Sequence, residues 1–418
     1  MPEPENNKSM LSEEEFMKLL LQEDDTFHDE GRDLYMSEVL SSVRRGLGDD
    51  GFDFGRGMAD QAGSRTARFG RNALLVTGRS SAASGLRDRI LAQLENAGVS
   101  CTVFEGVGSN PLMTSVDVGA AVARESGCDV VLAVGGGSQI DAAKAMALVA
   151  GNGGSVRDYT KGRGNAPGLK VLPVIAVPTT CGTGSEVNGF SVLTDPDTRD
   201  KAGMACSAAV PKVALVDPSV METMPQRIMS AVSFDALCHL MEAFVSSNHD
   251  DVSDAQCRRG MAMMAEGLVR ANEDIRDEEA LDKVVYASAL AGIPIYTKGT
   301  VAGHALEHPL SGLRNIAHGR GLAAVTPEIM RRNAKGAPER YAEISRIFGG
   351  KDENDVGDVV QNLIDQIGVT ATLSSEGFNH DDIEWLTGSA LRTVGSKMER
   401  NPVHFTADDI RSIYEACL

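Results

Sequence analysis

The sequence predicts an α/β dinucleotide-binding region followed by an all-helical region. Between residues 72 and 217, short runs of aliphatic and β-branched residues alternate with segments that have helical spacing. This alternation is typical of a parallel sheet whose strands are joined by crossover helices. Beyond Met221 the strand patterns stop and helical spacing continues. We therefore expect a Rossmann-like parallel sheet in the first half of the chain and an α-helical domain in the second.

Five runs have the composition of buried strands, with turn-forming residues around them. The segment that follows the first run, 85–97, has helical spacing and is expected to cross over to the next strand. Four segments of the second half carry apolar residues at the spacing of packed helices. The predicted strands are 73–77, 101–104, 129–134, 171–177 and 213–218, and the predicted helices of the second half are 228–245, 255–271, 281–291 and 338–348.

The first 65 residues differ in composition from the rest of the chain. They contain acidic runs and then a stretch rich in Gly and Asp between residues 46 and 57, which favours an extension outside the folded domains. Ser12 and Glu15 have the spacing of a helix-capping pair, so a short partner-binding helix is an alternative to a solvated tail. We predict an acidic extension over 1–65, an α/β domain over 66–218 and a helical domain over 219–418.

Charge and composition restrict the class of protein. The formal net charge is −19, and this negative field would repel the phosphates of nucleic acid and of an anionic membrane. No run approaches the roughly 18 apolar residues of a membrane span, and the N-terminal residues lack the pattern of a secretory signal. The seven cysteines include no CxxC pair, so we expect reduced thiols in a cytoplasmic protein without nucleic-acid or membrane partners.

A glycine turn, residues 135–137, follows the third predicted strand and opens a helical segment. Gly135, Gly136 and Gly137 would let the backbone approach a pyrophosphate, and the helix N-terminus would offer free N–H groups and a positive dipole. Ser138 and Asp141 have the spacing of a capping pair. An ordinary tight turn is the alternative, but the strand-to-helix setting favours dinucleotide binding.

Several motifs in the same order resemble those of the iron-containing alcohol dehydrogenase family. Gly-Gly-Gly-Ser-x-x-Asp-x-Ala-Lys over 135–144 resembles the family signature, 104–111 resembles the segment that ends in Asn-Pro, and 178–187 resembles its second cofactor loop. The resemblance extends over residues 72–327. It implies a dehydroquinate synthase-like architecture and an enzyme that transfers hydride between a nicotinamide dinucleotide and a small aldehyde or alcohol.

The resemblance also implies which residues hold the dinucleotide. The second loop, residues 178–187, carries small and hydroxyl side chains that can lie against nicotinamide and phosphate. Many NAD-using relatives carry an acidic residue at the position of Gly78, and Arg79 and Ser80 could bind a 2′-phosphate, so we expect NADP(H) to be preferred over NAD(H). The expected cofactor-binding residues are Gly78, Arg79, Ser80, Asn110, Gly135, Gly136, Gly137, Ser138, Asp141, Thr179, Thr180, Thr183, Ser185, Val187, Lys201 and His308.

One aspartate and several histidines are grouped in the second half. Asp235 and His239 are four residues apart, so on a helix they share a face and can bind one cation, although many exposed helices carry such a pair without metal. His304, His308 and His318 lie in two short segments. By resemblance to the family's metal site, Asp235, His239, His304 and His318 are expected to bind one divalent cation. This set suits Fe²⁺ or Zn²⁺ and does not choose between them.

His308 and Arg314 are expected near the substrate. The family implies that His308 lies beside the nicotinamide instead of binding metal, and an imidazole is well suited to relay the proton that the alkoxide needs, so we assign His308 a catalytic role. Arg314 lies in a stretch that the family uses to line the substrate cavity. An arginine there would be able to hold an anionic aldehyde, and an ordinary surface arginine is the alternative.

Two other functions are compatible with parts of this pattern. A glycerol-dehydrogenase-like or dehydroquinate-synthase-like enzyme would have the same architecture, but the Pro-Thr-Thr and His-x-x-x-His segments fit the alcohol dehydrogenase branch better. A non-catalytic relative could use its N-terminal arm for binding, yet every expected ligand position is filled here. We also expect a homo-oligomer, a dimer or larger, that acts on a small-molecule aldehyde or alcohol.

Overall fold

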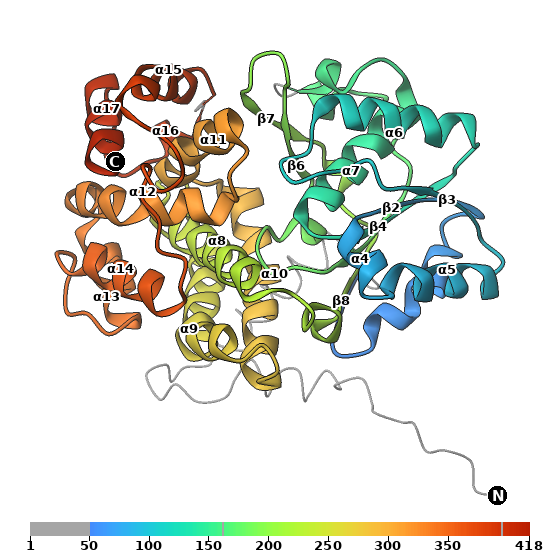
Figure 1. Cartoon of the computed structure of the whole chain (residues 1–418), viewed down its shortest axis with the longest axis horizontal. Coiled ribbons are helices and arrows are strands. Elements are labelled where there is room, and N and C mark those ends of the chain that lie inside the picture. Colours follow the sequence, from blue (N-terminus) through green and yellow to red (C-terminus); the bar gives the residue numbers. More distant parts are fainter. Residues whose placement is uncertain (1–50, 161–162, 394–395) are drawn as a thin grey trace, which may run out of the picture. The chain divides into compact units, whose positions relative to one another are not determined.

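A six-stranded parallel sheet forms the centre of the first half. The computed structural model describes residues 51–160, 163–393 and 396–418. The strands lie in the order β1-β8-β5-β4-β2-β3, and all neighbours are parallel (Figure 1). Because both faces of such a sheet are covered, its strands are runs of aliphatic residues. They are β1 (Phe52–Phe54), β2 (Asn72–Thr77), β3 (Ser100–Phe104), β4 (Val130–Gly135), β5 (Val174–Pro178) and β8 (Val213–Val216).

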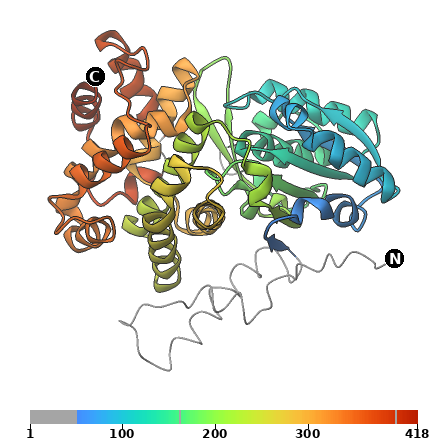
Figure 2. The ribbon, with the colours of Figure 1, turned by 60° about the horizontal axis from the view of Figure 1, so that its bottom comes forward.

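Helices cover both faces of this sheet, as Figure 2 shows. Leu74 and Val131 pack in one core with α6 and α7, while the next residues, Leu75 and Leu132, pack in another core with α5. The predicted parallel sheet with crossover helices is therefore confirmed. Its helices are α3 (Ala62–Thr66), α4 (Arg79–Ala83), α5 (Leu86–Asn96), α6 (Met113–Glu125) and α7 (Gly137–Asn152), with short 3-10 turns η1 (Met58–Gln61), η2 (Val156–Tyr159), η3 (Arg163–Asn165), η4 (Ser185–Val187), η5 (Ser207–Ala209) and η6 (Pro218–Met221).

The sheet starts earlier in the chain than the sequence predicts. Residues up to 65 were expected to form an extension, but β1 pairs with β8 in register, from Phe52 opposite Ala214 to Phe54 opposite Val216. Three residues between Gly51 and Gly55 carry too weak a pattern to indicate a strand. The pairing corrects the expected boundary at residue 65. The helix proposed after Ser12 lies outside the described residues.

Residues 52–56 also contact the helical half. The ring of Phe54 meets that of Tyr286 edge to face, with centroids 5.1 Å apart. The Arg56 guanidinium forms ion pairs with Glu222 and with Asp282, the latter at 3.0 Å. This segment therefore joins the edge of the sheet to α10.

An antiparallel hairpin was not expected from the sequence. It consists of β6 (Phe190–Thr194) and β7 (Lys201–Ala205) and follows the second loop directly. Its strands contain glycine, lysine and serine, so they do not resemble the aliphatic strands of the sheet. The hairpin brings Lys201 toward the helical half, as its hydrogen bond to Ser311 shows.

Every described element after β8 is helical, as the sequence predicts. The four predicted segments correspond to α8, α9, α10 and α13. α8 is long and apolar enough to cross a membrane, but 89% of its most apolar window is buried in the protein, as expected for a core helix. The elements are α8 (Gln226–Val245), α9 (Asp251–Glu273), α10 (Glu278–Lys298), α11 (Ala302–Arg314), α12 (His318–Asn333), η7 (Ala334–Gly336), α13 (Pro338–Ile347), α14 (Val356–Gln366), η8 (His380–Asp382), α15 (Ile383–Thr393), α16 (Ser396–Glu399) and α17 (Ala407–Ala416).

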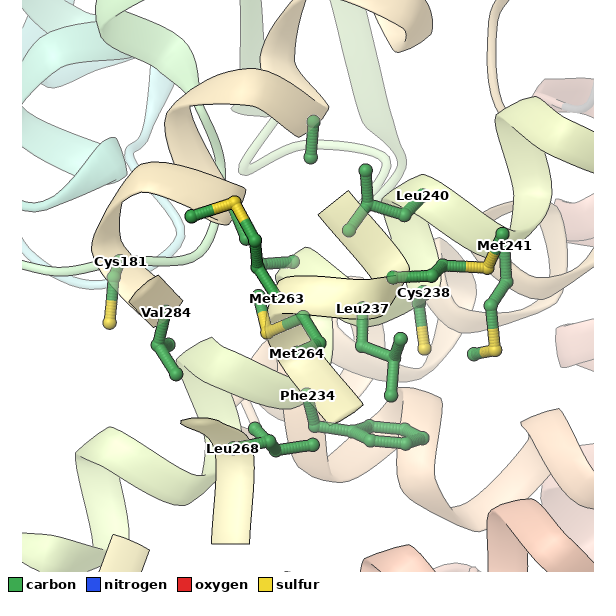
Figure 3. Close-up of a cluster of buried hydrophobic side chains, with 14 of the residues drawn as sticks. Cys181, Phe234, Leu237, Cys238, Leu240, Met241, Met263, Met264, Leu268 and Val284 are labelled. Carbon is green, nitrogen blue, oxygen red and sulfur yellow. The ribbon is translucent and has the colours of Figure 1, made fainter. Parts of the chain in front are cut away.

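The core where α8, α9 and α10 meet is rich in sulfur-containing side chains. Figure 3 shows Met241, Met263, Met264 and Cys238 in one buried cluster with Phe234. Methionine fills irregular gaps because its side chain is unbranched and flexible. All seven cysteines are free thiols. This core holds α8 firmly in place, and α8 carries the first part of the candidate site.

Candidate active site

Helix α8 presents three ionisable side chains on one face. Asp235, His239 and Glu242 are spaced i, i+4 and i+7, so they form one stripe along the helix. All three are at most 6% exposed. Buried ionisable groups need partners, because an unpaired charge in the interior is costly. The partners come from α11 and α12.

Helices α11 and α12 bring the remaining histidines to this stripe. His304 lies in the first turn of α11, His308 follows one turn later, and His318 is the first residue of α12. The close approach of α12 to α8 requires Gly319, because a Cβ at this position would lie 1.8 Å from the backbone oxygen of Ala231. The Ala-His-Gly segment therefore combines a candidate ligand with the contact that positions it.

Three of the four predicted metal ligands converge on a carboxylate oxygen of the fourth, Asp235. Oδ1 of Asp235 lies 3.3 Å from Nε2 of His304. The same oxygen lies 3.7 Å from Nε2 of His239 and 3.7 Å from Nε2 of His318. The rings of His239 and His304 are stacked with centroids 4.3 Å apart. All three histidines thus present the same nitrogen, Nε2, to Asp235.

Glu242 orients His304 through its other nitrogen. Nδ1 of His304 lies 2.6 Å from Oε1 of Glu242. Glu242 also accepts the backbone N–H groups of Val301, at 2.7 Å, and of His304, at 3.2 Å, so it caps the start of α11. An acceptor at Nδ1 keeps the ring proton there and leaves the Nε2 lone pair available to a cation.

Glu307 and a backbone carbonyl occupy the Nδ1 atoms of the other two histidine rings in the same way. Nδ1 of His318 contacts the Glu307 carboxylate, which also accepts from Oγ of Ser311 at 3.2 Å. Nδ1 of His239 lies 3.2 Å from the backbone oxygen of Gly182, in the second loop. Each Nε2 is therefore directed toward Asp235 by a separate partner behind the ring.

The electrostatics of the cluster favour an ionised carboxylate beside imidazole. Burial opposes the charge on Asp235, but the three neighbouring histidines outweigh it and hold the pKa of Asp235 well below its usual value. Burial lowers the pKa of His239 to about 4. Burial also acts on His304, yet the carboxylates of Glu242 and Asp235 raise the pKa of His304 to about 9. An anionic Asp235 next to a neutral His239 is the state in which these groups bind metal.

This donor set fits one divalent cation. Ligand atoms of Asp235, His239 and His304 all lie within 4.8 Å of one another, and His318 adds a third imidazole nitrogen. One carboxylate and three imidazoles without a thiolate suit Fe²⁺ and Zn²⁺. The ligand atoms of Glu307, His308 and His318 also lie within 4.8 Å of one another, but Glu307 is already engaged by Ser311 and His318.

The glycine turn and the second loop pack directly on each other. β4 ends at Gly135 and α7 begins at Gly137, which is the predicted strand-to-helix setting. A Cβ at Gly136 would lie 3.0 Å from Oγ1 of Thr180, and a Cβ at Gly137 would lie 2.3 Å from Cγ2 of Thr183. A side chain at either position would therefore press against a threonine of the second loop, and the closer contact is at Gly137.

The predicted capping pair of Ser138 and Asp141 does not form, because no side chain caps α7. Asp141 instead accepts from Oγ of Ser185 and from the backbone N–H of Val192, at 2.8 Å, and it lies 3.4 Å from Nζ of Lys144. A buried carboxylate gains more from these three partners than from one exposed N–H group. Asp141 thus joins α7 to the second loop and the hairpin.

A cavity of about 610 Å³ within the described part of the chain joins the predicted cofactor and metal residues, a size typical of small-molecule sites. All four predicted metal ligands line it. Of the predicted cofactor-binding residues, the cavity is lined by Asn110, Gly137, Ser138, Asp141, Thr183, Ser185, Lys201 and His308. Gly78, Arg79, Ser80, Gly135, Gly136, Thr179, Thr180 and Val187 are not among its lining residues.

Lys201 enters the cavity from the hairpin. Its Nζ donates to Oδ1 of Asn110 and to Oγ of Ser311, both at 2.9 Å. Ser311 in turn donates to Glu307, which supports His318. A chain of polar contacts therefore connects a cationic group of the α/β half with the candidate metal site.

His308 lies beside the four predicted ligands and has a lysine partner. Nζ of Lys397 lies 3.1 Å from Nδ1 of His308, so an ammonium group there donates to Nδ1 and the ring proton resides on Nε2. Burial and the positive charges of Lys397 and Lys201 hold the pKa of His308 well below its usual value. His308 is therefore a neutral imidazole at physiological pH.

The residues predicted to bind a 2′-phosphate of the cofactor or an anionic group of the substrate do not line this cavity. Gly78 is buried at the start of α4, and Arg79 and Ser80 are exposed. Arg314 forms an ion pair with Asp382 at 2.5 Å, and Arg314 does not line the cavity. Of the two interpretations of Arg314, the surface arginine agrees with the structure.

Three functional side chains were not singled out in the sequence. Glu242 and Glu307 both stand three residues after a predicted histidine ligand, so the repeated His-x-x-Glu spacing was a usable signal. Each glutamate, however, contacts a histidine of a different helix, which spacing alone does not reveal. Lys397 lies far along the chain in the short helix α16 and has no such signal.

Two sequence profiles of one enzyme family match the two halves of the chain. The profile described as iron-containing alcohol dehydrogenase matches residues 52–218. The profile described as the C-terminal part of the Fe-containing alcohol dehydrogenase family matches residues 229–418. The first match begins at β1 and ends in η6, and the second includes all four predicted metal ligands.

Individual proteins resemble the chain over most of its length. The NAD-dependent methanol dehydrogenase of Bacillus methanolicus is 31% identical over 376 residues, which span 87% of this chain and 97% of that protein. The lactaldehyde reductase of Escherichia coli K12 is 31% identical, with 86% and 96% covered. The crystal structure of an archaeal halo-thermophilic alcohol dehydrogenase from a Red Sea brine pool has a TM-score of 0.85 and 33% identity, covering 89% of this chain and 98% of that chain.

Proposed function

Because this chain belongs to the iron-containing alcohol dehydrogenase family of oxidoreductases, we propose that it transfers hydride between NAD(P)(H) and a small aldehyde or alcohol. One observation carries the proposal. The Nε2 atoms of three histidines converge on Asp235 in the wall of the cavity that also contains Gly137 and Ser138 of the turn region. A dinucleotide bound at the turn and a carbonyl bound beside the four predicted ligands would share one cavity.

We propose that Asp235, His239, His304 and His318 hold one divalent cation, Fe²⁺ or Zn²⁺. A cation bound there would supply Lewis-acid stabilisation of the negative charge that collects on the carbonyl oxygen. Glu242 and Glu307 support this assignment, because they keep Nδ1 of His304 and His318 occupied.

The dinucleotide is proposed to bind at the glycine turn and the second loop, and it would supply the hydride. The start of α7 offers backbone N–H groups, and Lys201 contributes a positive charge. A preference for NADP(H) is supported by the missing acidic side chain at Gly78 and by the exposed Arg79 and Ser80. We expect a lower KM for NADPH than for NADH, and an equal or reversed order would contradict the preference.

His308 is proposed to deliver the proton that completes reduction. Its Nε2 carries the ring proton, while Nδ1 faces Nζ of Lys397 at 3.1 Å. As a proton leaves Nε2, one from Lys397 can arrive at Nδ1, so the ring changes tautomer without becoming charged.

The experiment is steady-state oxidation of NADPH and NADH with short aldehydes, using protein stripped of metal by a chelator and reloaded with Fe²⁺ or Zn²⁺. We expect activity only after reloading. His239→Ala should abolish activity and lower the metal content, whereas His380→Ala, a change at an exposed histidine of η8, should leave both as in wild type. The proposal fails if no aldehyde is reduced with either metal, and the non-catalytic alternative is then favoured.

Location and assembly remain proposals based on the sequence. Seven free cysteines support a reducing, cytoplasmic environment. A homo-oligomer of two or more subunits is proposed from the family resemblance, and light scattering at low protein concentration would test it.

A further inference from the structure

The cavity contains cationic side chains that form no ion pair with any carboxylate of the described residues. Lys201, Lys397 and Arg400 all line it. Within the described residues, neither Lys397 nor Arg400 forms an ion pair with a carboxylate, and the one hydrogen bond that involves either side chain joins Lys397 to His308. Two unpaired cations in a concave site are a feature that the assigned metal and cofactor residues do not explain.

The lack of partners is notable because carboxylates are abundant in this chain. It contains 59 Asp and Glu residues against 40 Lys and Arg, and most described arginines that form side-chain contacts do so with an acid. Arg392, in the neighbouring helix α15, pairs with Asp200 at 3.1 Å, and Arg314 pairs with Asp382. In a protein with excess negative charge, cations without partners are available to an anionic ligand.

Lys397 lies at the reacting end of the cavity. Its Nζ is 3.1 Å from His308, which follows the predicted ligand His304 by one helical turn. The nearby carboxylates of Glu242 and Glu307 are engaged by histidines, so they do not neutralise the ammonium group through an ion pair. An ammonium has three donors, and His308 uses one of them. Burial lowers the pKa of Lys397 to about 8, a cost that a bound anion would offset.

Arg400 is held in the cavity wall by the backbone around it. Its carbonyl oxygen accepts from the N–H of Ser247 at 2.9 Å. Its guanidinium lies against Gly299, where a Cβ would approach Nη1 to 2.0 Å. Gly299 has φ +80°, a left-handed conformation that other residues rarely adopt, so this space is kept free of a side chain. A guanidinium in this position can bind an oxyanion with two parallel hydrogen bonds.

We propose that Lys397 and Arg400 form a subsite for an anionic group on the substrate, so that the preferred substrate is a short aldehyde that also carries a carboxylate or a similar oxyanion. This inference rests on the proposed function and specifies its substrate class. The anionic group takes no part in hydride transfer. It holds the aldehyde so that its carbonyl end is directed toward Asp235 and His308.

The phosphates of the dinucleotide are the competing explanation for these cations. The glycine turn and Lys201 lie on the α/β side of the cavity, whereas Lys397 and Arg400 come from the helical half and Lys397 contacts His308. A substrate anion is therefore favoured. If the two cations instead bound a cofactor phosphate, their removal would weaken dinucleotide binding.

The test compares two aldehydes that differ in charge, 4-oxobutanoate and butanal, on the metal-loaded enzyme. The readout is the selectivity ratio, which is kcat/KM for 4-oxobutanoate divided by kcat/KM for butanal. We expect wild type to favour 4-oxobutanoate, and Arg400→Gln and Lys397→Met each to lower the ratio about 10- to 100-fold, the range for losing a hydrogen bond to a charged group. Arg400→Lys and Lys397→Arg should restore part of it, and the control Arg314→Gln should leave it unchanged.

Dinucleotide Kd and metal content, measured on the same variants, should equal the wild-type values. The inference is overturned if wild type treats both aldehydes alike, if neither variant changes the ratio, or if the change appears in the dinucleotide Kd. Binding of 4-hydroxybutanoate and of 1-butanol, measured by calorimetry, separates the subsite from the reaction. Preferential binding of 4-hydroxybutanoate that Arg400→Gln removes supports the subsite even if no aldehyde is reduced, and equal binding of the two alcohols refutes it.

Discussion

Replacing Glu242 with glutamine would test whether the candidate metal site depends on support from a neighbouring helix. Oε1 of Glu242 lies 2.6 Å from Nδ1 of His304, and Oε2 accepts the N–H of Val301 at 2.7 Å. Glutamine has nearly the same size, but its amide nitrogen is a donor. One of these two N–H groups would therefore face another donor, and the negative charge would be lost.

The expected magnitude follows from these contacts. A hydrogen bond to a charged group contributes about 1.5–3 kcal/mol. Loss of a partner behind a metal-binding histidine typically weakens metal binding about 10- to 100-fold, which is about 1.4–2.7 kcal/mol. We expect Glu242→Gln to raise the metal Kd by a factor in this range, because the Nε2 atom of His304 would no longer be held toward Asp235.

The assay is competition between the protein and a chromophoric chelator for Zn²⁺, repeated for wild type, Glu242→Gln and Glu328→Gln. Glu328 lies on α12 and pairs with Arg332 at 2.7 Å, away from the four predicted ligands. The variant Glu328→Gln should keep the wild-type metal Kd. An unchanged Kd in Glu242→Gln, or an equal loss in both variants, would show that the support we assign to Glu242 does not act on the metal.

Three further predictions concern the loops, a buried acid and the proton relay. Gly137→Ala should cost about 1–3 kcal/mol of stability and raise the dinucleotide KM, because the added Cβ would lie 2.3 Å from Thr183. The control Gly108→Ala, whose Cβ meets nothing within 4 Å, should change neither quantity. Equal KM and Tm values for the two variants would contradict this prediction. Burial raises the pKa of Glu186 to about 7 from 4.5, so the Glu186 carboxyl binds its proton more tightly in the folded state than in the unfolded state. The stability that the protonated carboxyl contributes to the folded state is therefore lost as pH rises from 4.5 to 7. Glu186→Gln should therefore flatten the pH dependence of Tm over that interval, and an unchanged slope would refute the assignment. His308→Ala should lower kcat about 10²- to 10⁴-fold at unchanged metal content, and full turnover across the pH range would exclude the relay.

The sheet and the long helices could be predicted because their patterns reflect burial. Runs such as 130–135 are aliphatic since both faces of a parallel strand are covered, and α8 through α10 show the spacing of packed helices. The four residues predicted as ligands also come together, because Asp235 and His239 share one helix face and the histidine segments supply the rest. These features depend on local spacing, which the sequence displays.

Features that depend on contacts between distant segments could not be predicted. β1 is too short to show a pattern, and only its pairing with β8 defines it. Asp141 has the spacing of a capping residue, yet burial against Ser185 gives it stronger partners. Glu242 supports a histidine 62 positions away, and Lys397 contacts one 89 positions away. Such contacts arise from tertiary packing and produce no periodic pattern in the sequence.

The pairing of β1 with β8 has a practical consequence for shortened versions of the chain. A protein that begins at Gly51 keeps Phe52–Phe54 along β8, together with the Phe54 contact to Tyr286. A protein that begins at residue 66 loses that strand and leaves the N–H and C=O groups along one side of β8 unpaired. An uncovered strand edge of this kind is a template for aggregation. The choice of starting residue therefore decides whether β8 is covered by β1 or becomes an exposed edge strand that can pair with another molecule.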